Sequence, residues 1–344
     1  MLRIAMLTCA TAILGFSSVC AQPVADSRAN VATAEVAESN RLINLFGYQR
    51  SVVPLDGAYA INRAGDIAGK RGGNAAVYTQ GNVVILPGKV GYTNLQAVDI
   101  ADNGYIVGTG LSAGATRPLF WASMTSQPLD MSAIGRITVP TAINSQGVVV
   151  GYYYQGSTDD YPRAFRWSMA TGMADIAPAT TSVSQAFDIS ETGYIAGMAF
   201  YQSIGQQVVR WYPNGAVGRI TGPGFAEGAL ANGSVYGYTT LWDLKNTATP
   251  IGPNTATHAV KRISTTNRLV GFTLGEANGP RAWTTFNNSA ALYLSVPAGA
   301  IGFANDVNAC GTILGSIRLS NGTEQYVTWS KWTCDLLPPV ITAQ

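Results

Sequence analysis

The sequence predicts an all-β fold, a seven-bladed β-propeller with four strands in each blade. A twelve-residue motif, A-x-x-I-N-x-x-G-x-I-x-G, recurs seven times at an average spacing of about 41 residues, close to the period of a four-stranded blade. An aromatic residue follows each copy near the end of an expected third strand. The chain also holds 38 glycines while only 12% of its residues are charged, which suits many short strands and tight turns.

The seven motif copies are predicted to form β-hairpins. They end at Gly69, Gly108, Gly151, Gly197, Gly237, Gly271 and Gly315. In the third copy, PTAINSQGVVVG, Asn144 begins the turn and Gly147 follows three residues later. The position of Gly147 is occupied by Gly in every copy except the sixth, which has Asn267 there. Asn is the other residue that tolerates a positive φ. We therefore interpret these residues as backbone requirements of the turn and not as catalytic groups.

Two further strands are expected after each hairpin. The third strand of each unit ends on an aromatic residue, namely Tyr78, Trp121, Trp167, Trp211, Trp242 or Trp329, except that in the sixth unit Trp283 stands two places early. Because tryptophan recurs once per unit, we expect these rings to form the core between blades and not a row of ligand platforms. Four strands in each of seven units give the predicted propeller.

The repeats resemble those of a known family. The segments RAFRW at 163–167 and RAW at 281–283, the A-I-N-x-x-G-x-V-V-G hairpins and GMADI ending at Ile176 resemble the HAF extracellular repeat, over roughly residues 57–337. This chain has Arg163 or Arg281 where the name-giving His of the His-Ala-Phe tripeptide would stand. The resemblance implies a bacterial exported protein with propeller-like repeats, and it implies no defined activity.

The first residues indicate export. An apolar stretch follows Arg3, and the small residues Val19 and Ala21 occupy the −3 and −1 positions of a cleavage site. We predict a signal peptide at residues 1–21, cleaved after Ala21, and a periplasmic or secreted protein. The alternative is a lipoprotein acylated at Cys20, but the residues before this cysteine do not fit that signal.

The remaining chain divides into three parts. Residues 22–41 are Ala-rich and unpatterned, so we predict a flexible leader. Residues 42–337 hold the propeller, with repeats from about residue 57, and residues 338–344 form a tail. The segment LINLFGYQRSVVPL at 42–55 looks like two more strands, which either close the ring against the last blade or form a partial eighth blade.

Charge and hydropathy limit the partners. The formal net charge is +2 and no run of five like charges occurs, so neither nucleic acid nor an anionic membrane is implied. Beyond the signal peptide no stretch approaches the roughly 18 apolar residues of a transmembrane helix. We expect a monomer without membrane insertion.

Two cysteines, Cys310 and Cys334, follow the predicted cleavage site. In an oxidising compartment they are free to pair, and we predict a disulfide that stabilises the last blade. A metal or redox pair is the competing interpretation, but the chain has no CxxC and a single histidine, His258, in a connection between blades. No P-loop or EF-hand pattern is present either, so we expect no metal and no cofactor.

Binding residues are expected where connections vary in length. The connections between second and third strands vary most, and the richest is YYYQGSTDDYPR at 152–163. The candidate ligand-binding residues are Tyr152, Tyr154, Asp159, Asp160 and Tyr161, with Phe200 and Tyr201 from the next unit. Aromatic faces together with hydrogen-bond acceptors suit a sugar ring. The alternative is that alternate tyrosines are core residues of the second strand and the aspartates are merely solvated.

Three function classes follow from these observations. The first is an exported, non-catalytic propeller that acts as a binding or interaction module for a carbohydrate or a surface partner. The second is a propeller glycan hydrolase or lyase, in which carboxylates such as Asp99, Asp188 and Asp306 act at the channel. These three recur just before the last apolar residue of the first strand, so a structural role linked to the repeat is the competing interpretation. The third class is a structural repeat protein of the cell surface.

Overall fold

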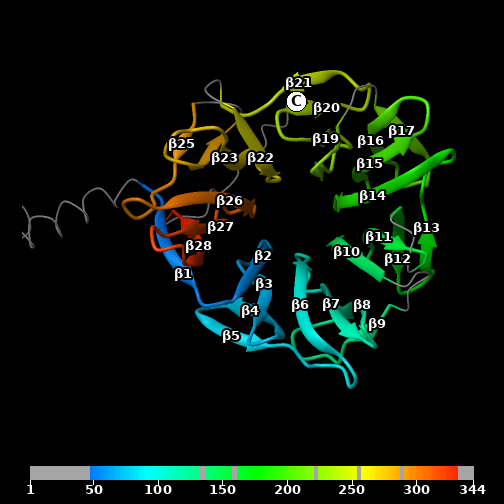
Figure 1. Cartoon of the computed structure of the whole chain (residues 1–344), viewed down its shortest axis with the longest axis horizontal. Coiled ribbons are helices and arrows are strands. Elements are labelled where there is room, and N and C mark those ends of the chain that lie inside the picture. The colour runs from blue at the N-terminus through cyan, green and yellow to red at the C-terminus, as the bar shows by residue number, and fades with distance from the viewer. Residues whose placement is uncertain are drawn as a thin grey trace, which may run out of the picture. The chain divides into compact units, whose positions relative to one another are not determined.

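A computed structural model describes residues 47–131, 137–156, 161–220, 224–253, 257–286 and 290–331 of the 344-residue chain. These residues form seven four-stranded antiparallel sheets arranged in a ring, so the predicted seven-bladed propeller is confirmed (Figure 1). The predicted signal peptide (1–21), leader (22–41) and tail (338–344) lie outside the described residues. Within the described part, no helix is long and apolar enough to cross a membrane.

The first four blades each use four consecutive strands. Blade one contains β2 (Gly57–Ile61), β3 (Ile67–Arg71), β4 (Asn74–Thr79) and β5 (Asn82–Ile85). Blade two contains β6 (Thr93–Ile100), β7 (Ile106–Ser112), β8 (Ala115–Trp121) and β9 (Leu129–Asp130). Blade three contains β10 (Ile137–Ile143), β11 (Val149–Tyr154), β12 (Arg163–Ser168) and β13 (Gly172–Asp175). Blade four contains β14 (Thr181–Ile189), β15 (Ile195–Tyr201), β16 (Gly205–Trp211) and β17 (Val217–Ile220).

Of the last three blades, only blade seven takes its fourth strand from the start of the ring. Blade five contains β18 (Gly228–Ala229), β19 (Val235–Tyr236), β20 (Thr240–Trp242) and β21 (Ala248–Pro250). Blade six contains β22 (His258–Ile263), β23 (Arg268–Thr273), β24 (Ala282–Phe286) and β25 (Leu292–Tyr293). Blade seven contains β26 (Ile301–Val307), β27 (Ile313–Arg318), β28 (Glu324–Ser330) and β1 (Gln49–Val53).

Strand β1 closes the ring. It pairs antiparallel with β28, from Gln49 opposite Ser330 to Val53 opposite Tyr326, and supplies the fourth strand of blade seven. Of the two open interpretations of segment 42–55, its described part therefore supports ring closure and not a partial eighth blade. Pairing the two ends of the ring leaves no unpaired edge on β28, which would otherwise invite association with other chains.

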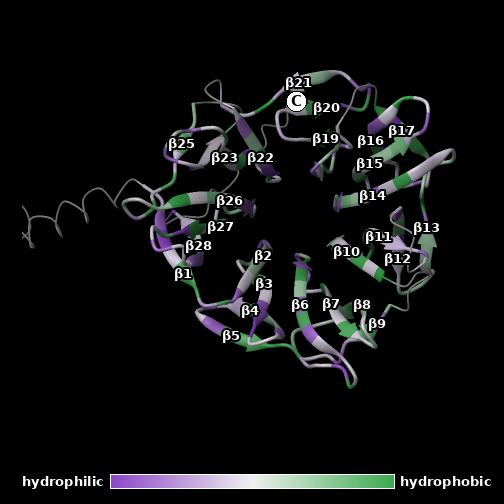
Figure 2. Cartoon of the chain, viewed as in Figure 1, coloured by the Kyte–Doolittle hydropathy of each residue, from purple (hydrophilic) through white to green (hydrophobic). Residues whose placement is uncertain are grey.

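The hydrophobic core is divided among the seams between blades. Seven clusters of buried residues occur in the described ring, each drawn from two neighbouring blades. Hydrophobic residues are accordingly spread around the whole ring (Figure 2). The third-strand tryptophans Trp121, Trp167, Trp211, Trp283 and Trp329 are all buried, which confirms their predicted role as core.

Several of these tryptophans also tie blades together by hydrogen bonds. The Nε1 of Trp211 donates to the carbonyl of Ile176 in blade three at 2.7 Å. Trp121 and Trp329 donate in the same way to Pro87 and Ser295, at 2.9 and 2.8 Å. Each of these three rings therefore contributes apolar area and also satisfies its one polar atom.

The final glycine of the motif is required by a bulge in the facing strand. In blade two the register shifts between Ala97 and Asp99, and this brings the carbonyl of Gln96 close to Gly108. A Cβ on Gly108 would lie 2.0 Å from that carbonyl oxygen, a distance that no side chain permits. The same contact would be 1.9 to 2.1 Å at Gly69, Gly151, Gly197, Gly271 and Gly315. The glycine thus allows the two backbones to approach at the bulge.

The turn residues behave as the motif predicts. Gly147 has φ 72° and Asn267, the one replacement for Gly, has φ 59°. Asn144 accepts the N–H groups of Gln146 and Val148, both at 3.1 Å, through its Oδ1. Its Nδ2 donates to the carbonyl of Ser190 in the next blade at 3.1 Å. The motif asparagine therefore shapes its own turn and links it to the neighbouring blade.

Candidate functional site

The ring has two faces with different chain segments. We call the face that carries the Asn-x-x-Gly turns the turn face. The opposite face carries the second-to-third strand connections, such as 202–204, and the connections between blades, and we call it the connection face. Antiparallel strands alternate in direction, which places these two kinds of connection at opposite ends of every blade.

The candidate tyrosines of blade three lie at the connection-face end of β11. Tyr153 is buried in the cluster between blades two and three. Because neighbouring residues of a strand point to opposite sides, Tyr152 and Tyr154 point toward blade four. Their rings are 6.0 Å apart in an edge-to-face arrangement, and both are partly buried. Burial and the neighbouring Tyr154 raise the pKa of Tyr152.

The structure brings some of the other candidates to this seam and separates others. Tyr201 packs against the cluster between blades three and four, so it shares the seam with Tyr152 and Tyr154. Phe200 lies on the opposite side of β15 and is 42% exposed. Tyr161 precedes β12 and is 59% exposed. The candidates Asp159 and Asp160 lie outside the described residues.

Sequence reasoning missed a polar cluster beside this seam. The hydroxyl of Tyr153 donates to Asp175 Oδ2 at 2.8 Å, and Nε of Arg163 lies 2.6 Å from the same oxygen. Burial alone would raise the pKa of Asp175, but the hydrogen bonds from Arg163, the Ala177 N–H and Tyr153 bring it below its usual value. Arg163 thus anchors β12 to β13.

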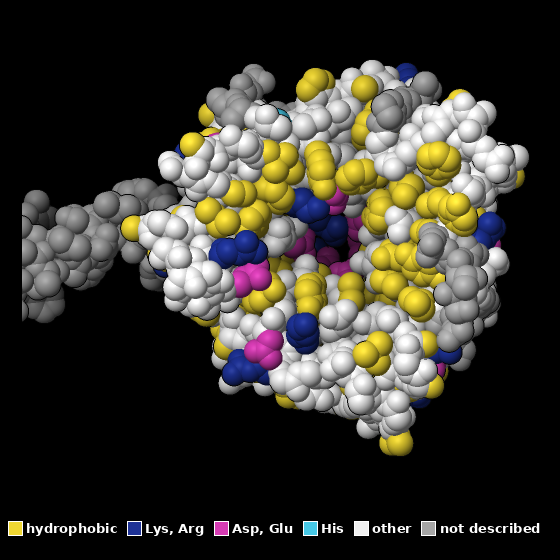
Figure 3. Space-filling model, viewed as in Figure 1, with side chains coloured by type: hydrophobic (Ala, Val, Ile, Leu, Met, Phe, Trp, Pro, Cys, Tyr) yellow, Lys and Arg dark blue, Asp and Glu magenta, His cyan; other side chains and the backbone are white. Residues whose placement is uncertain are grey.

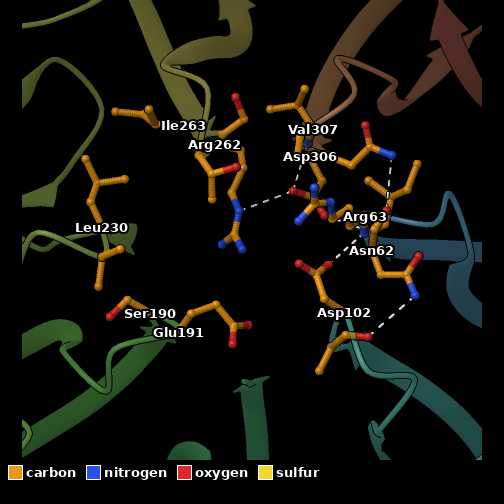
Figure 4. Close-up of a pocket in the computed structure, with 18 of the residues that line it drawn as sticks. Asn62, Arg63, Asp102, Ser190, Glu191, Leu230, Arg262, Ile263, Asp306 and Val307 are labelled. Carbon is orange, nitrogen blue, oxygen red and sulfur yellow. Dashed lines mark hydrogen bonds and ion pairs between the residues drawn. The ribbon is translucent and has the colours of Figure 1, made fainter. Parts of the chain in front are cut away.

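A central hollow opens on the turn face. It has a volume of about 320 Å³ and is lined by the ends of all seven inner strands. On the face shown in Figure 3, hydrophobic side chains surround the opening at the centre of the ring, and charged side chains lie deep inside it. Figure 4 shows Arg262 joined to Asp306 in the hollow, with Asp102 and Glu191 reaching in from other blades.

The recurring aspartates bind backbone groups of the following blade. Asp99 accepts the N–H of Ile143 at 2.8 Å, and Asp188 accepts the N–H of Ala229 at 2.9 Å. Asp306 accepts the N–H of Ile61 at 2.8 Å in the same manner. In each receiving blade the residue at the aspartate position is small, namely Ala142, Gly228 or Ala60, which leaves room for the incoming carboxylate. The structural role linked to the repeat is therefore confirmed for these residues.

Arg262 takes the aspartate position in the sixth copy, VKRISTTNRLVG, and sequence reasoning missed it. Its Nη1 lies 3.0 Å from Asp188 Oδ1 and its Nε lies 3.3 Å from Asp306 Oδ1. Burial raises the pKa of Asp99 to about 7, although the charge of Arg262 and the Ile143 N–H act to lower it. Burial also raises the pKa of Asp306, against the same guanidinium. The one basic residue of this layer therefore offsets part of its negative charge.

Two other residues singled out by the sequence have structural surroundings. His258 packs edge-to-face on Trp283 at 5.8 Å, and its Nε2 lies 2.9 Å from the carbonyl of Ile251. Cys310 lies in the turn after β26, where Asn308 Oδ1 accepts its N–H at 3.1 Å. Its predicted disulfide partner Cys334 lies outside the described residues, so the disulfide stays a prediction. Among the described residues, no group of three or more His, Cys, Asp or Glu is placed to hold a metal ion.

Comparisons with known proteins identify the fold alone. No protein-family model and no curated protein matches the sequence. A solved prolyl endopeptidase is 11% identical with a TM-score of 0.51, and the match covers 88% of this chain and 54% of that one. A puromycin hydrolase is 12% identical with a TM-score of 0.52, covering 79% and 52%. TolB from Acinetobacter baumannii is 12% identical with a TM-score of 0.40, covering 92% and 73%. The chain thus spans about half the length of the two enzymes it resembles.

Proposed function

We propose that this propeller is a non-catalytic binding module that takes a carbohydrate on its connection face. The proposal is supported by the distribution of exposed aromatic side chains over the two faces of the ring. Five large aromatic residues are exposed in the described part, namely Tyr59, Tyr161, Phe200, Tyr238 and Phe286. Tyr161, Phe200 and Tyr238 stand at connection-face ends of strands, and Tyr59 comes from the inner strand β2. Of the five, Phe286 alone ends a strand on the turn face.

The chemistry of this face suits a sugar. An exposed aromatic ring offers an apolar platform to the C–H face of a pyranose, and neighbouring polar groups can bind its hydroxyls. Beside Tyr238, Lys261 Nζ lies 5.4 Å from the ring centroid and 2.8 Å from Glu227 Oε2. This paired charge supplies a donor and an acceptor without a net charge. A neutral glycan therefore fits the face better than an anion.

The contacts of the carboxylates in the centre favour binding over hydrolysis. Asp99 accepts the N–H of Ile100 through Oδ1 at 2.9 Å and that of Ile143 through Oδ2 at 2.8 Å. A carboxylate held by two backbone donors is poorly placed to move a proton to substrate. One observation favours the alternative of a glycan hydrolase, because a pKa of about 7 is what a general acid needs. Release of reducing sugar by the wild type and its absence in Asp99→Asn would establish that alternative.

A glycan array tests the proposal directly. The mature wild type is compared with Tyr161→Ala, Phe200→Ala and the matched control Phe286→Ala, which removes an equally exposed ring from the turn face. Losing a stacking ring should weaken binding of the same glycans by about tenfold for Tyr161 or Phe200. Binding that only Phe286→Ala weakens would contradict the proposal. A blank array with the wild type would instead favour a surface protein as the partner.

We also infer that the chain is an exported protein of the HAF repeat type. The apolar stretch after Arg3 and the residues Val19 and Ala21 support export, and the repeat hairpins with RAFRW support the family. Expression in a bacterial host with N-terminal sequencing of the exported product checks this inference. A product that begins at Gln22 is expected, and a full-length cytoplasmic product would oppose it.

A further inference from the structure

A second hollow opens on the connection face between blades one and two. It has a volume of about 520 Å³ and lies between the ends of β3 and β7 and the start of β6. Its polar lining includes Asp56, Lys70, Asn94, Gln96 and Thr109. This volume is within the range of sites for small organic ligands. The seam with Tyr152 and Tyr154 lies two blades further along the ring, so the hollow is a separate place on the same face.

The backbone at the entrance is shaped irregularly. Strand β6 has a second register shift, between Thr93 and Gln96, which among the inner strands described only β14 shares. Within this shift Asn94 has φ 49°, a left-handed conformation that costs most side chains energy. The N–H of Leu95 donates to the carbonyl of Gly73 in blade one at 3.0 Å, which fixes the bulge against the other wall. Bulges of this kind redirect a side chain, and here Asn94 lines the hollow.

One wall of the hollow is held in place by internal hydrogen bonds. Gln96 Nε2 donates to Thr109 Oγ1 at 3.1 Å, and the hydroxyl of Tyr59 donates to Gln96 Oε1 at 3.3 Å. On the blade-one side, Asp56 Oδ2 accepts the N–H of Gly72 at 2.6 Å. These side chains are therefore oriented before any ligand arrives, which reduces the entropy lost on binding.

Three other polar groups of the hollow have donors or acceptors available for a ligand. Within the described part of the chain, Lys70 Nζ, the side-chain amide of Asn94 and the hydroxyl of Thr116 have no protein partner. Lys70 offers donors, Asn94 offers a donor pair and an acceptor, and Thr116 offers both. The lining carries one cation, Lys70, and one anion, Asp56, and Asp56 Oδ1 also lies 3.9 Å from Nε of Arg71. Amides, hydroxyls and charged groups of both signs match the alternating donors and acceptors of sugar hydroxyls.

We propose that this hollow is a second, polar carbohydrate subsite, which binds one or two units of a neutral oligosaccharide through Asn94, Lys70 and Thr116. The inference rests on the proposed carbohydrate binding and extends it to a part of the ring that the aromatic seam does not include. Because both places lie on the connection face, a longer glycan can occupy both, and linking two weak sites raises the overall affinity.

The test uses the mature full-length protein and a panel of neutral oligosaccharides of glucose, xylose and N-acetylglucosamine, two to six units long. Titration is followed by ¹⁵N-resolved NMR, with side-chain amide signals of Asn94 and Gln96 as reporters. The test variant is Asn94→Gly with Lys70→Met, since Gly keeps the left-handed backbone and Met keeps the apolar stem of Lys. Gln80→Gly is the matched control, because Gln80 has φ 48° but follows the third strand of blade one on the turn face.

The outcomes separate the two proposals. We expect binding to shift the Asn94 and Gln96 signals, and the double variant to bind about tenfold more weakly while Gln80→Gly binds normally. Shifts confined to the region of Tyr161 and Phe200, with unchanged affinity in the double variant, would overturn the second subsite and leave the proposed function intact. Failure of the wild type to bind any sugar of the panel or of a glycan array would overturn both.

Discussion

A carboxylate oxygen of Asp306 accepts the backbone N–H of Ile61 at 2.8 Å, and this bond joins the last blade to the first. Asp99 and Asp188 make the same contact to blades three and five, so aspartate and a small residue alternate around the inner layer. A ring of seven positions cannot alternate without one exception. Blade six supplies that exception with Arg262, which lies between two of the three carboxylates.

Replacing Arg262 should destabilise the ring. The Arg262→Met variant leaves the buried Asp188 and Asp306 carboxylates without their cation, which is costly in a partly dehydrated site. Because the Arg262 side chain is itself 39% exposed, we expect a loss of about 2 kcal/mol in the free energy of unfolding at neutral pH. Urea unfolding measures it. Arg63→Met, which removes an exposed arginine from the same hollow, should change stability by less than about 0.5 kcal/mol. Equal losses in both variants would argue against a specific role for Arg262.

Stability should fall as the pH rises from about 4 to 7. The folded-state pKa of Asp99 is raised to about 7, so in this window the folded protein keeps a proton that the unfolded chain has released. Each unit of difference in pKa costs about 1.4 kcal/mol, and above pH 7 the slope from this group vanishes. Asp306, whose pKa is also raised, acts in the same direction. Urea midpoints of the wild type and Asp99→Asn between pH 4.5 and 8.5 check this, and the variant should lose much of the slope. A wild type whose stability rises across this window would contradict the raised pKa.

A methyl group on Gly108 should disrupt blade two. The Cβ of Gly108→Ala would lie 2.0 Å from the Gln96 carbonyl oxygen, so the bulge must move. We expect a loss of about 3 kcal/mol or more, visible in thermal unfolding. Gly88→Ala is the control, because nothing lies within 4 Å of a Cβ there. Similar melting temperatures for the two variants would show that the bulge is not rigid.

Sequence patterns revealed the parts of this fold that the backbone imposes on each repeat. The hairpin turns need Gly or Asn at positions such as Gly147 and Asn267, and the tryptophans recur at the blade period, so both are visible without structure. The bulge that demands the final glycine was not visible, because it depends on the register between two strands. The sequence also left open whether segment 42–55 closes the ring, since pairing β1 with β28 joins residues from opposite ends of the propeller.

The candidate site was only partly predictable from the sequence, because several of its contacts depend on how strands pair. Strand alternation predicts that Tyr153 faces away from Tyr152 and Tyr154, and Tyr153 is indeed buried in the core between blades two and three. The contact of Arg163 with Asp175 could not be read from spacing, since it depends on how β12 pairs with β13. The hollow beside Asn94 is formed by two blades and a local left-handed residue, and no motif marks it.

The most direct test of ligand binding on the connection face is hydrogen–deuterium exchange of the mature protein, measured with and without the best glycan from an array. We expect slower exchange in peptides that contain Tyr152 to Tyr154, Tyr161 and Phe200, and no change in the turns that contain Asn62 and Asn144. Protection confined to the turns around the central hollow would contradict the account, because it would place the ligand on the opposite face.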